Sequence, residues 1–333
     1  MSRRTRLLLL GCGAALFAYL VSRIGLKELI ASAAQTGWMF LVILFVYGLV
    51  CACNAWAWLL IMAREPRRPS FWRAYAITVS GFALNFVTPM LNVGGEPFKV
   101  AAVGPWLPRR RAIGSVIIHN GLRILSFLLS WLTAIVLGFV MLPHDWVTLS
   151  LLTGAGLFVG ALTGLLLAAH RRGALAAVLS ALHRIPGLRA LARLLEPHRE
   201  LLVQMDEQIA QFYHADPRQF ARALALEYLS RCLYMAEFYL IALSIDLPMS
   251  YPQAFLIGGL STLIQNVLFM IPYEVGSKEG ALYALFGMLG FDPKLGVYTA
   301  IVSRVRDLFW IGVGLALLWA AGRGRAGAAE VAS

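Results

Sequence analysis

Two long apolar stretches of this chain, residues 74–103 and 252–290, are each broken by a short polar segment containing glycine, proline and glutamate. In or beside each stretch, a glutamate follows a proline by seven residues and an arginine follows that glutamate by 27. The first set is Pro89, Glu96 and Arg123, and the second is Pro272, Glu279 and Arg306. Every member of the second set lies 183 positions after its counterpart in the first. A charge at the centre of a bilayer costs roughly 2.5–3.5 kcal/mol, so ionisable residues in apolar segments are candidates for function. The spacing predicts a duplicated architecture around a shared site.

The composition places the chain among membrane proteins. Hydrophobic residues make up 59% of it and charged residues only 14%, whereas soluble domains carry about 25% charged residues. The net charge of +12 does not indicate nucleic-acid binding, because the arginines cluster in short loops between apolar runs. That distribution is typical of cytoplasmic loops in membrane proteins. We predict a single all-α, polytopic membrane domain over residues 1–333.

Six apolar segments are long enough to cross about 30 Å of hydrocarbon as helices. The predicted spans are 7–24, 38–62, 113–141, 148–169, 220–245 and 296–320. Basic residues flank them in alternation, which predicts cytoplasmic N- and C-termini in a cell inner membrane.

The two broken stretches are predicted to be re-entrant helical hairpins. The first limb of 74–103 has about 15 residues, or roughly 22 Å, which is too short to cross. Basic loops flank this first stretch, so both its ends are expected inside; the second stretch lacks such loops, so both its ends are expected outside. The halves, about 1–141 and 148–322, therefore form an inverted-topology repeat of the kind found in transporters. The insertion at 171–219 is either an amphipathic surface helix or a solvated connector.

The first break places a carboxylate among cations. Gly94 and Gly95 permit a turn or a close backbone approach. Pro97 suits the first position of the returning helix, and Glu96 then lies near its positive dipole end. Lys99 lies one turn further on. Glu96 is thus either a helix-start carboxylate or part of a binding site in which the nearby cations bind a phosphate.

The second break repeats this mixture of charges. Across both breaks, the candidate headgroup-binding residues are Gly94, Gly95, Glu96, Lys99, Arg123, Glu274, Lys278, Glu279, Arg304 and Arg306, and the candidate helix breaks are Pro89, Pro97, Pro272, Gly276 and Gly280. In the span 220–245, Glu227 and Arg231 share a helix face and are expected to pair. Carboxylates and guanidinium groups together suit a lipid headgroup with a phosphate and an amine.

The motifs at the two breaks resemble those of the lysylphosphatidylglycerol synthase transmembrane region, also called the flippase-like domain family. Asn85-Phe86-Val87-Thr88-Pro89 and Gly94-Gly95-Glu96-Pro97-Phe98-Lys99 are similar to its first signature, with Lys99 in place of the usual arginine. Pro272, Gly276, Glu279, Gly280 and Ala281 match its second signature, Pro-Gly-Gly-x-Gly-x-x-Glu-Gly, where Tyr273 and Glu274 replace two glycines.

The resemblance implies a flippase-like transporter that moves a polar-headed phospholipid or glycolipid, anionic or amine-bearing, between leaflets. It also implies a lipid-modifying enzyme as a partner. The aminoacyl-transfer activity of relatives with a soluble domain is not expected, because the chain ends at Ser333 without one. No cofactor, metal or catalytic residue is predicted, and no phosphate-binding loop for ATP occurs.

Two other functions stay open at this stage. An integral membrane lipid-headgroup or glycosyl transferase would use Glu96 or Glu279 as a general base. A non-catalytic scaffold of a lipid-modifying complex would use 171–219 as its docking surface.

Overall fold

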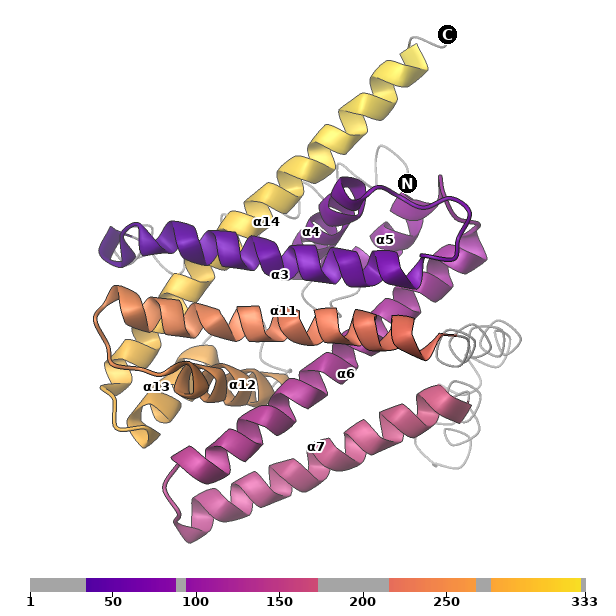
Figure 1. Cartoon of the computed structure of the whole chain (residues 1–333). Helices are drawn as coiled ribbons and strands as arrows, with labels where there is room; N and C mark the ends of the chain where they lie inside the picture. Colours follow the sequence, from indigo (N-terminus) through magenta and orange to yellow (C-terminus); the bar gives the residue numbers. More distant parts are fainter. Residues whose placement is uncertain (1–33, 88–93, 173–215, 268–276, 331–333) are drawn as a thin grey trace, which may run out of the picture.

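The computed structural model describes residues 34–87, 94–172, 216–267 and 277–330, and all the regular elements in these ranges are α-helices (Figure 1). In chain order they are α3 (Met39–Ile61), α4 (Phe71–Val87), α5 (Gly95–Val103), α6 (Arg109–Met141), α7 (Trp146–Arg172), α11 (Pro217–Ser244), α12 (Tyr251–Val267), α13 (Ser277–Met288) and α14 (Pro293–Glu330).

The helices agree with most of the predicted segments. Each predicted span after the first coincides with one long helix, namely α3, α6, α7, α11 and α14. The span 7–24 and most of the insertion 171–219 lie outside the described residues. Of the described helices, α3, α6 and residues 146–167 of α7 are long and apolar enough to cross a membrane by length and composition. α11 and α14 are as long, but each carries several ionisable side chains.

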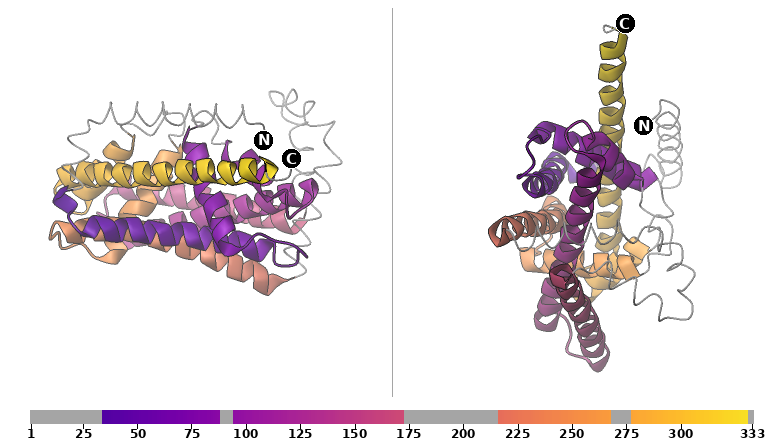
Figure 2. Two further views of the ribbon diagram at one scale, coloured as in Figure 1. Left: turned by 90° about the horizontal axis from the view of Figure 1, so that it is seen from above. Right: turned by 90° about the vertical axis from the view of Figure 1, so that its right-hand side faces the viewer.

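Each half of the chain repeats the same order of helix lengths. A long helix, a helix of 17 residues, a short helix and a second long helix occur as α3–α6 and again as α11–α14. The halves interlock, because α4 packs against α14 and α12 packs against α6. α3 and α11 run side by side along one face of the molecule (Figures 1 and 2).

The two pairs of shorter helices start from opposite ends of the α3–α11 pair. An ion pair of 3.4 Å between Arg64 and Asp216 joins the end of α3 to the start of α11. Arg111 lies 3.4 Å from Glu65, so α6 also begins at this end. α4 and α5 therefore leave from it and return to it. α12 and α13 lie between the end of α11 and the start of α14, at the other end of the pair.

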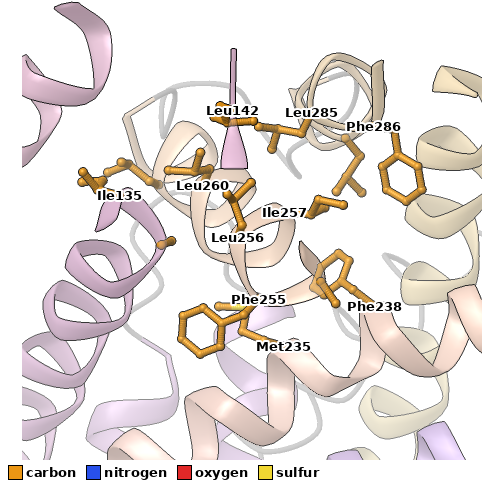
Figure 3. Packing of buried hydrophobic residues seen from close by; sticks show 14 of the residues in the cluster. Ile135, Leu142, Met235, Phe238, Phe255, Leu256, Ile257, Leu260, Leu285 and Phe286 are labelled. Carbon is orange, nitrogen blue, oxygen red and sulfur yellow. The ribbon is translucent and has the colours of Figure 1, made fainter. Parts of the chain in front are cut away.

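The largest apolar core holds α12 and α13 between α6, α11 and α14. Figure 3 shows its centre, where Phe255 and Ile257 of α12 meet Phe238 of α11 and Phe286 of α13. Every side chain from Ala254 to Leu263 is buried. A helix that is buried all round belongs to the interior of a bundle, as a hairpin enclosed by spanning helices would.

The outer faces of α3 and α7 are apolar and uncovered. Phe45 of α3 is 67% exposed, and Leu157 and Leu165 of α7 are 71% and 67% exposed. Apolar surface of this extent is unfavourable in water and is accounted for by contact with lipid tails. Figure 2 shows that α14 continues past the other helices toward the C-terminus; it ends at Glu330, ten residues beyond the predicted span.

Replacing Gly314 by alanine is expected to lower the free energy of unfolding by about 1–3 kcal/mol, the usual cost of overpacking. A Cβ at Gly314 of α14 would lie 2.6 Å from the backbone oxygen of Val79 in α4. The matched control is Gly312→Ala, because a Cβ at Gly312 has no atom within 4 Å. That control should be neutral or more stable by up to about 1 kcal/mol, since alanine favours helix. Unfolding of the purified protein in mixed micelles measures both, and equal effects would contradict the close packing of α4 on α14.

Candidate functional site

The first short helix begins in a small network around Asn85 of α4. Asn85 Oδ1 accepts a hydrogen bond of 2.7 Å from the Gly95 N–H, and its Nδ2 donates one of 3.3 Å to Glu96 Oε1. Lys99 Nζ lies 3.6 Å from Glu96 Oε2, and the lysine side chain is only 3% exposed. Glu96 is thus held by an amide and an ammonium group as well as by the N-terminus of α5.

The local geometry corrects two predictions about this break. Gly94 has φ −65° and ψ −33°, so it is helical and not in a left-handed turn, and α5 begins at Gly95. Pro97 is therefore the third helical residue and not the first; its missing N–H is tolerated because first-turn amides have no helical partner. Close approach accounts for Gly95, since a Cβ there would lie 2.3 Å from the Gly81 backbone oxygen.

The second short helix also begins with a paired carboxylate. Arg304 of α14 holds Glu279 of α13, with Nη2 and Nε at 2.7 and 2.8 Å from Oε1. Lys278 Nζ lies 3.8 Å from Asp307 Oδ2. The Glu96 and Glu279 side chains keep 22% and 27% of their surface exposed although both are paired, and Glu96 Oε2 itself is buried.

Arg306 does not pair with Glu279, the glutamate of its own set. It is 1% exposed, its Nη2 lies 2.7 Å from Glu237 Oε2 of α11, and its Nε donates to Glu237 Oε1 at 3.3 Å. Its Nη1 lies 3.2 Å from Asp307, and the guanidinium carbon is 4.1 Å from the ring centroid of Tyr47. This arginine is enclosed by protein partners, which indicates that it stabilises the fold where α3, α11 and α14 meet.

Arg123, the counterpart of Arg306, has a different environment. Among the described residues, the Nε atoms of Arg123 and of Arg231 in α11 have no hydrogen-bond partner; Nη1 and Nη2 of Arg306 have none either, but both of these atoms lie in ion pairs. Arg231 lies over the Phe127 ring, 4.0 Å from its centroid. Glu227 and Arg231 attract each other electrostatically, but the direct hydrogen bond of Glu227 is to His119 of α6, at 2.9 Å. The four-residue spacing within α11 had favoured a direct pair between Glu227 and Arg231, but Glu227 bonds a residue of another helix instead.

The charged groups of both halves meet beside α3. The Cys51 thiol of α3 lies within the electrostatic reach of Arg123, Arg231 and Arg306. Arg123 also acts on Glu96 and on Lys99. Arginines of both halves, Arg123 of α6, Arg231 of α11 and Arg306 of α14, are therefore close to one residue of α3. With Lys99 beside Arg123, this region gathers several cations, which can attract a group carrying negative charge.

Several predicted residues stay untested by geometry. Pro89, Pro272, Glu274 and Gly276 lie outside the described residues. Gly280 lies inside α13 as its fourth residue, so the helix is not broken there.

Sequence reasoning overlooked His119 as a site residue and read Asn85 only as part of a motif. His119 is fully buried in a segment predicted as an apolar span, with its ring stacked on Trp58 at a centroid distance of 5.8 Å. A histidine within such a span, four residues before Arg123, was the signal that could have found it.

Comparison with known proteins gives one family. The model of the lysylphosphatidylglycerol synthase TM region matches residues 6–316, which is nearly the whole chain. No curated protein and no solved structure matches the chain. The match covers both breaks and every helix that contributes a charged group to the site. The chain therefore belongs to the lysylphosphatidylglycerol synthase transmembrane-region family.

Proposed function

We propose that this protein moves a polar-headed lipid, a phospholipid or a glycolipid, between the two leaflets of the membrane. The observation that carries the proposal is the cluster beside α3, which gathers Arg123, Arg231 and Arg306 from both halves and in which, among the described residues, the buried Nε atoms of Arg123 and Arg231 have no hydrogen-bond partner. Charged side chains inside a membrane are costly, so they are rare, and they typically pair with one another or mark the path of a substrate. The family match supports a membrane role connected with lipids.

In this proposal the two breaks act as re-entrant hairpins that face each other from opposite leaflets in an inverted repeat. The N-termini of α5 and α13 would point into the bundle, where their positive dipole ends favour an anion. Arg123, Arg231 and Lys99 would hold a headgroup phosphate. Glu96 and Glu279, both partly accessible, would hold an amine or hydroxyl groups. The acyl tails would remain in the bilayer throughout.

The charge distribution supports one orientation. The end where α3 finishes and α4, α6 and α11 begin carries the arginine-rich loops, including Arg64 and Arg111. The opposite end carries Asp145, Asp246 and Asp292. The positive-inside rule would place the arginine-rich end in the cytoplasm, with the protein in the inner membrane and both termini inside.

The proposal is tested with purified protein in liposomes that contain fluorescent NBD-labelled phosphatidylglycerol, in parallel with labelled phosphatidylethanolamine and a labelled glycolipid. Movement between leaflets is followed by albumin back-extraction. Glu96→Gln and Glu279→Gln are expected to slow movement by about tenfold to a hundredfold, because losing a charge-assisted interaction costs about 1.5–3 kcal/mol and about 1.4 kcal/mol is one decade.

The matched control is Glu65→Gln at the arginine-rich end, which should leave the rate within about twofold, because its pair with the 57%-exposed Arg111 side chain contributes little. Movement no faster than in empty liposomes, for all three lipids, would refute the proposal. If a strain without the protein then lacked one lipid species, a transferase would be favoured instead.

A further inference from the structure

His119 and Glu227 form a buried acid–base pair between α6 and α11. His119 Nε2 and Glu227 Oε1 are 2.9 Å apart, and the two side chains are 1% and 0% exposed. The imidazole stacks on Trp58 of α3 at an interplanar angle of 16°, and the Trp58 Nε1–H donates to Ser115 Oγ at 3.3 Å. Three helices thus fix the ring in place. His119 is the eleventh residue of α6, about 15 Å along the helix at 1.5 Å per residue.

Each member of the pair has one polar atom left over. Among the described residues, His119 Nδ1 and Glu227 Oε2 are buried and have no hydrogen-bond partner. Buried polar groups are usually hydrogen-bonded, so each of these two atoms can take a further partner or a proton without losing an existing bond. With Nε2–H donating to the carboxylate, Nδ1 carries the free lone pair of the ring. A proton can therefore bind at Nδ1 while the bond to Glu227 is kept.

The pair is next to the cations assigned to the headgroup. Lys99 of α5 and Arg123 of α6 act electrostatically on His119. Arg231 of α11 acts on Glu227, and Cys53 of α3 also lies within its electrostatic reach. With His119 neutral, the three cations face two carboxylates, Glu96 and Glu227. The cluster therefore has a net charge of +1, and a proton at His119 would raise it to +2.

We propose that His119, held by Glu227, is a proton-binding site, and that a proton and an anionic lipid headgroup bind together and cross the membrane together. This inference rests on the proposed function and adds a driving force for lipid movement, namely the proton gradient across the membrane. A proton and a phosphodiester anion attract each other in a medium of low dielectric constant, and together they add no net charge to the cluster. The proton comes from water on one side, forms an N–H bond at Nδ1, and returns to water on the other side.

The test uses the same liposomes with NBD-labelled phosphatidylglycerol, first at pH 7 on both sides and then with the outside one pH unit more acidic. One proton per lipid allows an inner-to-outer leaflet ratio of up to about tenfold for one pH unit, because a unit of pH corresponds to 1.36 kcal/mol. The wild-type protein should approach this ratio, while empty liposomes give the background. His119→Gln keeps a donor toward Glu227 but takes up no proton, so its ratio should stay near one.

The matched control is His144→Gln, because His144 is exposed in the loop between α6 and α7 and should give the wild-type ratio. A second measurement needs no variant: with the pH dye pyranine inside, a phosphatidylglycerol gradient at equal pH should acidify the lumen. Lipid movement that ignores the pH gradient and leaves the dye unchanged would overturn the proton site while keeping the lipid transporter. No lipid movement at equal pH would instead refute the proposed function, and the proton site with it.

Discussion

Replacing Arg306 by methionine is expected to lower the free energy of unfolding by about 3–5 kcal/mol, the cost of breaking a buried ion pair from one side. The substitution removes the cation that Glu237 and Asp307 share, at 2.7 and 3.2 Å. Glu237 is 4% exposed on its side chain, so its carboxylate would be left buried without its partner. Methionine is apolar and of similar length, so loss of volume contributes little to the effect. Unfolding of the purified protein in mixed micelles measures it.

Two further variants show how much of this loss comes from the unpaired buried charge. Arg64→Met breaks the pair with Asp216, where the arginine side chain is 60% exposed, and should cost less than about 1 kcal/mol. Adding Glu237→Gln to Arg306→Met removes the unpaired charge and should restore much of the lost stability. If Arg306→Met lowered the free energy of unfolding no more than Arg64→Met does, Arg306 would not be the structural arginine that its burial indicates.

Replacing Gly95 by alanine is the second substitution with a large expected effect, both on stability and on lipid movement. The new Cβ would lie 2.3 Å from the Gly81 backbone oxygen and 2.7 Å from Asn85 Oδ1. Backbone does not yield as a flexible side chain does, so α5 must shift away from α4, at a cost of at least about 1–3 kcal/mol. The shift also separates Asn85 from Glu96, so the rate of lipid movement should fall together with the stability.

The matched control for this substitution is Gly280→Ala in α13. Gly280 is also close to a site glutamate, but a Cβ there has no atom within 4 Å. Its stability should be unchanged or slightly higher, because alanine favours helix. Comparison of unfolding and of lipid movement for the two variants checks the prediction. A Gly95→Ala protein as stable as Gly280→Ala would show that α4 and α5 are not in backbone contact.

The positions of the helices could be predicted from the sequence because each apolar segment is bounded by polar or basic residues. α3, for example, begins and ends within one residue of the predicted span 38–62. The two interrupted stretches were also recognised, since glycine and proline follow limbs too short to cross. The exact start of α5 was missed by two residues, because a first-turn proline fits more than one position of a helix.

The partners of the charged residues could not be predicted in the same way. Local spacing reveals pairs that are three or four residues apart, such as Glu96 and Lys99. It gives no sign of His119 bonding Glu227 over 108 positions, or of Arg306 reaching Glu237 over 69. These contacts depend on which helices lie side by side. The exact numerical repeat had suggested equal roles for Arg123 and Arg306, whereas Arg306 is ion-paired with Glu237 and Asp307 and Arg123 has no ion pair among the described residues.

The interlocking of the two halves constrains how the chain is made. Ser80 of α4 donates a hydrogen bond of 3.1 Å to the Gly314 carbonyl, across 234 positions of sequence. At about 5–20 residues per second, the ribosome needs roughly 10–50 s to supply that partner. During this interval α4 has left the ribosome while the surface that covers it in the finished protein does not yet exist. The early half must therefore wait in the membrane with a face uncovered, and the last helix to be synthesised completes the packing of one of the first.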